Sequence, residues 1–561
     1  MPLPAIETNL PPEKAPQPGA FSALLRRDFY SGWRLVILAV AALVLAPLSV
    51  VFFSWRAPAT EIWQHLADTL LVDLLLNTFW LVTGVSLGTL ILGVSLAWLT
   101  AVCDFPGRKL FSWALLLPLA VPTYVLAFVS LGLLDYAGPL QSALRAWFGS
   151  SNWFPDVRST AGVVTVMTLA LYPYVYLLTR NAFQTQGKRM LEAAESLGCP
   201  PWRAFFLVVL PMARPWIAGG VLLVIMEALA DFGAVSIFNF DTFTTAIYKA
   251  WFGFFSLAAA AQLASGLVLI VFVIIAGEQW LRRRQRFTAA RLSASSERLQ
   301  LRGAARWGAF AYALGVLTIA FLVPLLQLTA WTLKSFHREF DDRYLALLLR
   351  SLGLALSAAL LVTLIALVLA YAKRRHPDRL TGALVRTANL GYALPGTVLA
   401  VGIVIPIAAI DNALIEWGRR LFGLELGLML QGTVAIMLIA YLVRFMAAGF
   451  KPIDGAMHRV TPSIDEAARL LGLRGVKLLA RIHLPMLRGG VLTAATLVFV
   501  DVMKEMPITL MTRPFGWDTF AVKIFELTSE GEWERAALPA LTILLAGLVP
   551  IVLLMRHSEK S

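Results

Sequence analysis

The sequence predicts an all-α integral membrane protein with about twelve transmembrane helices in two parallel six-helix repeats. Three observations support this class. First, 58% of the residues are hydrophobic and 15% are charged, whereas about a quarter of the residues of soluble domains are charged. Second, long apolar runs recur along the chain. Third, motifs of the first half recur in the second half at a nearly constant spacing. The surplus apolar surface is therefore expected to face lipid.

A spanning helix needs roughly 20 mostly apolar residues, and twelve stretches meet this requirement. We expect them at 33–55, 74–102, 109–134, 159–182, 212–236, 255–280, 305–332, 347–372, 383–410, 428–450, 487–511 and 535–556. Each half carries six spans, and an even number returns the chain to its starting side. The halves are therefore predicted to be parallel copies related by a pseudo-twofold axis along the membrane normal.

Lysine and arginine gather in the loops after the second, sixth and eighth spans. They are Arg108, Lys109, Arg282, Arg283, Arg284, Arg286, Lys373, Arg374, Arg375 and Arg379. The positive-inside rule puts these loops and both termini in the cytoplasm. Topology thus accounts for the net charge of +14. A nucleic-acid partner would need basic residues gathered on one folded domain, and we expect none.

The same patterns divide the chain into five parts. These are a flexible cytoplasmic tail (1–30), the first repeat (31–280), a basic cytoplasmic linker (281–304), the second repeat (305–556) and a short cytoplasmic tail (557–561). The first tail has no basic segment followed by an apolar core, so it is not a signal peptide. Cys103 and Cys199 fall in predicted cytoplasmic loops, where neither a structural disulfide nor a metal site is expected.

One motif occurs in both halves, between the fourth and fifth spans of each. It reads Glu-Ala-Ala, three residues, Gly, nine residues, an aliphatic residue, one residue, Leu-Pro. The first copy is Glu192, Ala193, Ala194, Gly198, Val208, Leu210 and Pro211, and the second, 274 residues later, is Glu466, Ala467, Ala468, Gly472, Ile482, Leu484 and Pro485. A plain amphipathic linker turn is the alternative interpretation, but the coincidence would have to occur twice.

Simple helix chemistry fits this motif. The segment 191–197 consists mostly of good helix formers, so a short helix along the membrane surface is predicted. Ala193 and Ala194 are small and would let a partner come close. Gly198 is a plausible helix stop, because glycine accepts the left-handed conformation. Pro211 is expected near the start of the next span, where a missing N–H costs little.

Carboxylates inside two predicted spans also repeat. Glu227 and Asp231 in the fifth span correspond to Asp501 and Glu505 in the eleventh. The i,i+4 spacing would put both acids of a pair on one helix face, and charge in a bilayer is costly enough to indicate function. The four acids could line a central path. The alternative is that Lys504 pairs with one or two of them and locks the helices together.

A second pattern follows each acidic pair. Residues 240–243 read Phe-Asp-Thr-Phe, and residues 517–520 read Trp-Asp-Thr-Phe. Asp-Thr favours a turn or helix cap, so both should be outer loops leading into a short helix. They are either plain caps or contacts for a delivering protein.

The doubled motif resembles the cytoplasmic loop of ABC importer permeases. The segments 228–236 and 501–509, the fused two-repeat layout, and the Thr-Pro-Ser-Ile-Asp run before the second Glu-Ala-Ala are similar to those of ferric iron importer permeases. The resemblance covers about residues 30 to 556 and implies the type I importer permease fold. Permeases for thiamine, polyamines, sulfate and phosphonates share much of this architecture, so these substrates remain alternatives.

The resemblance also implies partners. Each loop would dock into a cleft on an ATP-hydrolysing subunit, with Glu192 and Glu466 making polar contacts, and a periplasmic binding protein would deliver the substrate in the bacterial inner membrane. The chain has no Gly-x-x-x-x-Gly-Lys-Ser/Thr phosphate loop, so ATP and Mg²⁺ are expected on two separate ATPase subunits. We expect no catalytic residue, no bound cofactor and no resident metal site in this chain.

Two other function classes fit the sequence less well. A secondary transporter driven by ions also has twelve spans in two parallel halves, but it has no use for the doubled loop motif. A membrane-bound enzyme would need a clustered catalytic set, and the six histidines form none.

Overall fold

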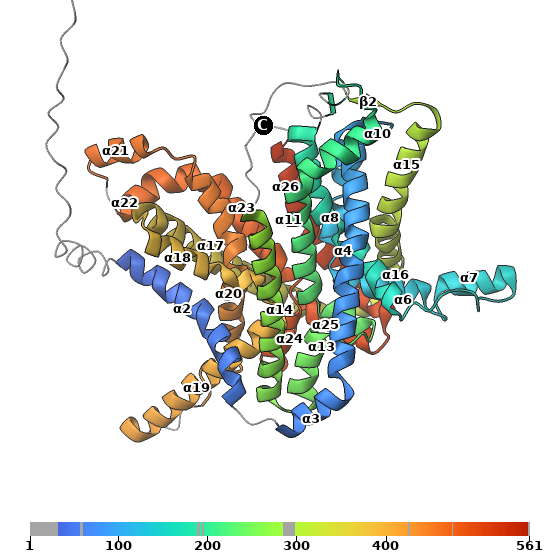
Figure 1. Cartoon of the computed structure of the whole chain (residues 1–561). Coiled ribbons are helices and arrows are strands. Elements are labelled where there is room, and N and C mark those ends of the chain that lie inside the picture. The colour runs from blue at the N-terminus through green and yellow to red at the C-terminus, as the bar shows by residue number, and fades with distance from the viewer. Residues whose placement is uncertain are drawn as a thin grey trace, which may run out of the picture.

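The computed structural model describes residues 32–56, 60–187, 191–192, 194, 196–283, 298–423, 427–473 and 475–558. The tail predicted at 1–30, Ala193, the linker residues 284–297 and the last three residues lie outside this description. Within it the chain is almost entirely helical (Figure 1), which confirms the all-α class. The only strands in these ranges form a two-residue parallel pair, with Cys103 opposite Leu299 and Asp104 opposite Gln300.

The first half begins at the helix α2. Its elements are α2 (Gly32–Phe53), η1 (Ser54–Arg56), α3 (Thr60–Thr69), α4 (Leu71–Ala101), β1 (Cys103–Asp104), α5 (Arg108–Ala114), η2 (Leu117–Ala120), α6 (Thr123–Leu134), α7 (Pro139–Phe148), α8 (Thr160–Ala182), η3 (Phe183–Gly187), α10 (Pro201–Ala204), η4 (Phe205–Val209), α11 (Leu210–Ala230), α12 (Gly233–Ile237), α13 (Phe243–Tyr248), η5 (Lys249–Gly253) and α14 (Leu257–Arg283).

The second half begins at the strand β2. Its elements are β2 (Leu299–Gln300), α15 (Gly303–Leu317), η6 (Thr318–Leu322), α16 (Val323–Glu339), α17 (Asp342–Arg375), α18 (Arg379–Ala388), η7 (Leu390–Ala393), α19 (Gly396–Phe422), α20 (Val434–Met457), α21 (Pro462–Leu470), α22 (Val476–Leu478), η8 (Leu479–His483), α23 (Leu484–Met503), α24 (Pro507–Thr512), α25 (Phe520–Ser529) and α26 (Trp533–Ser558).

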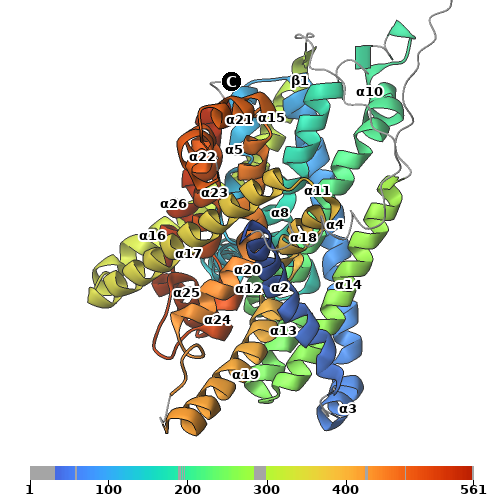
Figure 2. The same ribbon diagram turned by 90° about the vertical axis from the view of Figure 1, so that its left-hand side faces the viewer.

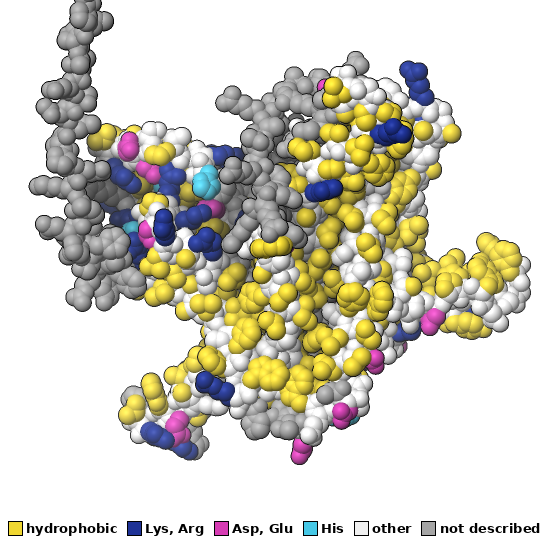
Figure 3. Space-filling model, viewed as in Figure 1, with side chains coloured by type: hydrophobic (Ala, Val, Ile, Leu, Met, Phe, Trp, Pro, Cys, Tyr) yellow, Lys and Arg dark blue, Asp and Glu magenta, His cyan; other side chains and the backbone are white. Residues whose placement is uncertain are grey.

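The predicted spans are largely recovered. Eleven helical stretches of the described residues are long and apolar enough to cross a membrane, and the twelfth predicted span coincides with α26. Figure 3 shows hydrophobic side chains over the middle of the visible face and charged side chains mostly toward its two ends. This pattern fits a belt in contact with lipid.

The third and ninth spans are interrupted, contrary to the prediction of single helices over 109–134 and 383–410. α5 ends at Ala114 and α6 begins only after Pro122, while α18 ends at Ala388 and α19 begins only after Pro395. Both prolines have extended backbone, with ψ of 145°. Proline also disfavours helix in the residue before it, which explains the two breaks.

The fifth and eleventh spans end early. They were predicted to run to 236 and 511, but α11 ends at Ala230 and α23 at Met503. In each half a short helix, α12 or α24, follows the break. The tenth span is displaced as well: α20 begins at Val434 rather than near 428, because Thr433 caps it by accepting a hydrogen bond from the Ala435 N–H at 3.3 Å.

Each half is built on three closely packed helices, α4, α8 and α11 in the first and α17, α20 and α23 in the second. Small residues let these helices approach one another. A Cβ at Gly93 of α4 would lie 2.7 Å from Cβ of Val175, and a Cβ at Gly220 of α11 would lie 2.8 Å from the Val175 Cα. Both glycines are thus needed for α8 to pack between its neighbours, as is usual for helices in membranes.

The first helix of the first half packs against the second half. α2 lies along α18 and α19 (Figure 2), while α16 lies mainly against α26 of its own half and also touches α6 of the first half. Arg34 of α2 makes a 2.9 Å ion pair with Asp378, and a Cβ at Gly402 of α19 would lie 2.8 Å from Cβ of Pro47. The buried side chains accordingly form two cores that each combine elements of both halves. The repeats visible in the sequence are therefore not separate packing units.

Candidate functional site

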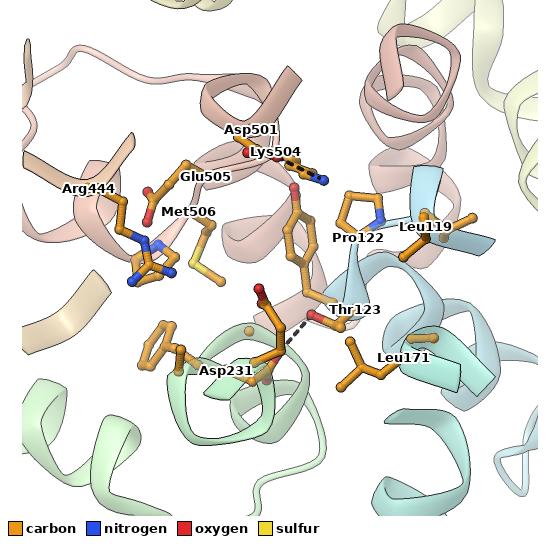
Figure 4. A pocket seen from close by; sticks show the side chains of 18 of the residues that line it. Leu119, Pro122, Thr123, Leu171, Asp231, Arg444, Asp501, Lys504, Glu505 and Met506 are labelled. Atoms are coloured by element: carbon orange, nitrogen blue, oxygen red, sulfur yellow. Dashed lines mark hydrogen bonds and ion pairs between the residues drawn. The ribbon is translucent and has the colours of Figure 1, made fainter. Parts of the chain in front are cut away.

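A cavity of about 170 Å³ lies between the two halves, where α6, α8, α11, α20 and α23 meet. All five residues predicted to form a central path line it: Glu227, Asp231, Asp501, Lys504 and Glu505. Figure 4 shows Asp501, Lys504 and Glu505 on one side of the cavity and Asp231 with Thr123 on the other. The structure thus brings the repeated acids together.

The two acids of each pair do not share a helix face, so that part of the prediction is wrong. Asp231 follows the last residue of α11 and has extended backbone, with ψ of 131°. Glu505 lies beyond Lys504, the residue that caps α23. Only Glu227 and Asp501 belong to the long helices, because the chain leaves the helical path before the second acid of each pair.

Asp231 and Glu505 instead cap the short helices that follow them. Asp231 Oδ1 accepts hydrogen bonds from the Ala234 and Val235 N–H groups at 2.9 and 3.2 Å. Glu505 accepts from the Ile508 N–H at 3.1 Å and from the Thr509 N–H at 3.3 Å. A carboxylate is well suited to this place, because it satisfies free N–H groups and interacts favourably with a helix N-terminus.

The two caps are matched to their neighbours. In the first half Thr123 Oγ1 donates to Asp231 Oδ2 at 2.5 Å. The corresponding position of the second half is Gly396, where a Cβ would lie only 2.9 Å from Glu505 Oε1. The longer glutamate leaves little room for a side chain beside it, whereas the shorter aspartate leaves room for a threonine that hydrogen-bonds to it.

The remaining three charged residues differ in their bonding. Lys504 Nζ lies 3.2 Å from Asp501 Oδ1, as expected if Lys504 pairs with one acid. Glu227 makes no hydrogen bond or ion pair within the described part of the chain. Among the four acids of the cavity, it is the one whose carboxylate has neither a hydrogen bond nor an ion pair within the described residues.

The loop motifs form two further sites, at the end of the molecule where α10 and α21 lie (Figure 1). Gly198 and Gly472 have φ of 80° and 81°, and the N–H groups of Cys199 and Leu473 return to the carbonyls of Ala194 and Ala468 at 3.0 Å each. These bonds end both short helices in the same way. The predicted role of the glycines as helix stops is confirmed.

The side chains of each loop divide between two faces. Glu192, Glu466 and Ala467 are exposed, and the leucines before the glycines, Leu197 and Leu471, are 88% and 81% exposed. Ala194 and Ala468 are buried against the rest of the chain. The second alanine of each motif therefore packs inward, contrary to the prediction that Ala194 faces a partner.

Pro211 is the second residue of α11, as predicted, and Pro485 holds the same place in α23, although both helices continue longer helical stretches. The stretches start at Trp202 and Val476, and the prolines follow the wide turns η4 and η8. Leu210-Pro211 and Leu484-Pro485 open α11 and α23 directly after these turns. A wider turn changes the hydrogen-bonding pattern of the preceding residues, so a proline can follow without breaking the helix.

A family model for the inner membrane component of binding-protein-dependent transport systems matches residues 89–287 and 362–560. The two matches include both loop motifs and both acidic pairs. This chain belongs to that family.

The permease is similar to characterised transport proteins over most of its length. It is 26% identical to the Fe(3+)-transport system permease protein FbpB 2 of Haemophilus influenzae over 94% of this chain and 98% of that protein. It is 23% identical to the ferric transport system permease protein FbpB of Actinobacillus pleuropneumoniae over 79% of this chain and 64% of that one. It is also 29% identical to the molybdenum transport system permease protein ModB of Escherichia coli, over 36% of this chain and 88% of ModB.

These relatives identify the permease as a membrane transport component of an ABC importer rather than an enzyme. The family name includes dependence on a binding protein and a place in the inner membrane. Twofold occurrence of the family pattern confirms the fused two-repeat architecture.

Sequence reasoning missed Arg444 of the permease, which lines the central cavity from α20. Its guanidinium donates to the Leu394 carbonyl and lies beside Glu505 in Figure 4. The equivalent position of the first half is Ala170, so a search for repeated charges could not find it. The sequence feature that could have identified Arg444 is that it is a single arginine inside a predicted span, where charge is costly. With Lys504 it places two cations against four carboxyl groups.

Sequence reasoning also missed an ionic cluster under the second loop. Asp465 accepts from Arg374 Nε at 2.8 Å and hydrogen-bonds to His483 Nε2 at 2.7 Å. Burial raises the pKa of Asp465, but the hydrogen bonds from His483 and Arg374 outweigh it and hold that pKa below its ordinary value. The cluster fixes α21 to the end of α17.

Proposed function

We propose that this permease carries ferric iron across the inner membrane, after delivery by a periplasmic binding protein. The observation that carries the proposal is the similarity to the FbpB 2 permease over 94% of the chain. The central cavity supports it, because carboxylates outnumber cations there and Fe³⁺ is a hard cation that favours carboxylate oxygen.

The cavity favours passage over storage. The described residues contain no group of three or more His, Cys, Asp or Glu side chains arranged to hold a metal ion. Two of the four acids are engaged as helix caps and a third pairs with Lys504. Glu227 is therefore the residue expected to contact the cargo, and weak contacts suit a path from which the ion must leave again.

Two separate ATPase subunits are expected to bind the two loops, one to each. Glu192 and Glu466 offer polar groups, and the exposed Leu197 and Leu471 offer apolar area next to them. ATP and Mg²⁺ would be held by those subunits. Their closure would pull on the loops and switch the spans between inward and outward states, which is coupling between distant sites. Both termini are expected in the cytoplasm with the loops.

Molybdate is the second candidate cargo. The similarity to ModB favours it, and Arg444 and Lys504 could contact an oxyanion. The acidic excess of the cavity argues against it, because a doubly charged anion would be repelled there.

The test is uptake of radioiron and of radioactive molybdate by cells that contain the permease with its cognate ATPase and binding protein. Cells that lack only the permease are the control. We expect iron uptake to require the permease and molybdate uptake to be indifferent to it. The reverse result would move the cargo to the oxyanion, and dependence of neither on the permease would reject both cargoes.

The coupling role has its own test. The Glu192→Ala/Glu466→Ala variant is expected to lose the ATPase stimulation caused by the loaded binding protein. Glu61→Ala/Glu530→Ala, which changes two exposed acids away from the loops, is the matched control. Equal stimulation in both variants would show that the loop glutamates do not transmit the signal.

A further inference from the structure

A second cavity, of about 300 Å³, lies under the second loop, between the end of α17 and the helices α21 and α22. Three arginines line it, together with Asp465 and His483. It is separate from the central cavity, and the transport role proposed above does not use it.

The three arginines are not equally engaged. Arg374 donates to Asp465 and to the carbonyls of Met457 and Thr461 at 2.8, 3.1 and 3.3 Å. Arg375 and Arg469 make no hydrogen bond or ion pair with the rest of the described chain. Two guanidinium groups are thus free to bind a ligand, and the planar guanidinium is the side chain best suited to carboxylate or phosphate.

His483 adds a buried polar atom without a partner. The side chain is 1% exposed, its Nε2 bonds to Asp465, and its Nδ1 has no hydrogen-bond partner among the described residues. A buried nitrogen left unbonded costs free energy, so the arrangement favours a ligand that bonds to it. When the ring carries both protons, the Nδ1–H group can donate a hydrogen bond to an anion.

Four of the corresponding positions in the first half carry no charge, while the counterpart of Arg469 is Glu195. The residues 274 positions before Arg374, Arg375, Asp465 and His483 are Thr100, Ala101, Leu191 and Val209. Leu191 and Val209 are buried, so the fold closes this region with apolar side chains equally well. The charges of the second half are therefore not a requirement of the architecture.

We propose that this cavity binds an oxyanion of the phosphate class, held by Arg375, Arg469 and His483. The carbonyl end of α17 lies close by and opposes an anion. A charge-assisted hydrogen bond is stronger than this end effect, so two arginines outweigh it. The anion is either free phosphate or the phosphate of a lipid headgroup. Bound there, it would link α17 to α21 and stiffen only one of the two loops.

The test uses the full-length permease in nanodiscs of neutral phosphatidylcholine, titrated with inorganic phosphate by calorimetry. We expect saturable binding that Arg375→Gln/Arg469→Gln weakens by at least about tenfold, because two charge-assisted bonds are lost. The control is Lys477→Gln/Arg481→Gln, which removes the same charge from exposed positions of the same segment that do not line the cavity. No saturable binding, or equal weakening in both variants, would overturn the proposal.

A second arm separates the two sources of phosphate. The titration is repeated in nanodiscs that contain phosphatidylglycerol. If the headgroup occupies the cavity, phosphate affinity falls in the wild type, and the fall disappears in Arg375→Gln/Arg469→Gln. Unchanged affinity identifies the free anion as the ligand. Neither readout involves iron uptake, so failure of the cargo assignment leaves this test intact.

Discussion

At the residue scale, the acids of the central cavity have unequal roles although the sequence presents them as equivalent pairs. Repetition in the sequence located all four, because an acidic residue recurs at each position after a shift of 274 residues. It could not show that Asp231 and Glu505 leave the helix and accept backbone N–H groups, since helical spacing alone suggests a shared face. A search for repeated charges could not find Arg444, because the corresponding residue of the first half is Ala170. Hydrogen bonding and ion pairing, more than charge, thus distinguish Glu227, the acid proposed to contact the cargo, from the other three acids.

Glu227→Gln is expected to lower iron uptake by about tenfold or more, because a contact worth about 1.5 kcal/mol to the cargo is lost. Thermal stability should remain near that of the wild type, since Glu227 makes no hydrogen bond or ion pair within the described residues. The measurement is radioiron uptake with the melting temperature in parallel, and Glu61→Gln is the control. Normal uptake by Glu227→Gln would remove this residue from the path.

Asp231→Ala, unlike Glu227→Gln, should lower the thermal stability of the permease. It removes a cap that accepts two N–H groups and the Thr123 hydroxyl, so we expect a loss of about 1–2 kcal/mol. Asp231→Asn keeps a capping oxygen and should retain most of the stability. Differential scanning fluorimetry of the purified permease distinguishes them, and equal melting of both variants would argue against the capping role.

The ionic cluster under the second loop predicts a dependence on pH. The pKa of Asp465 is held below its ordinary value, so its contribution is complete above about pH 4 and is lost as the pH falls through the lowered pKa. The melting temperature should fall on acidification, and less steeply for Asp465→Asn. Identical acid profiles for the two proteins would mean that Asp465 adds nothing to acid sensitivity.

At the scale of elements, the sequence located the helices better than it located their interruptions. Apolar length identified the spans, since lipid contact demands it. Apolar runs contain both the breaks at Pro122 and Pro395 and the early ends of α11 and α23. Hydropathy does not change at these points, so it cannot locate them. The wide turns η4 and η8 are set by backbone geometry at equivalent positions of the two halves. Only the Leu-Pro that follows each turn marks it in the sequence.

Gly472→Ala tests the ending of the second loop helix. The backbone φ of 81° is left-handed, and a Cβ in that region costs roughly 1–2 kcal/mol, while nothing lies near enough to clash. We expect faster hydrogen exchange in α21 and weaker ATPase stimulation. Gly489→Ala, at a glycine with ordinary φ and equally open space, is the control; a matching change there would exclude backbone strain as the cause.

At the scale of the whole molecule, helices of each half pack against helices of the other half. The sequence showed the repeat but not that helices of one half pack against helices of the other. A repeat period does not indicate which copy a helix contacts. Arg34 with Asp378 and Gly402 with Pro47 join α2 to the second half. The ring of Phe128 stacks on that of Trp331, with centroids 6.3 Å apart, which joins α6 to α16.

Two separately expressed chains, cut between α14 and β2, are therefore expected to assemble in the membrane. Affinity purification through a tag on one half should recover the other in about equal amount. Gly402→Leu in the second half should weaken recovery by forcing α2 away, whereas Gly353→Leu, with open space around it, should not. Independent purification of both halves would contradict this packing between the halves.

The position of α2 also has a consequence for biosynthesis. Its partner α18 is synthesised about 330 residues after it. At about 5–20 residues per second this interval lasts roughly 20 to 60 seconds. Over that time the helix waits in the bilayer without its main partners, so the order of synthesis and the order of assembly differ. A chain that stops translating before α18 would leave α2 without its contacts to α18 and α19.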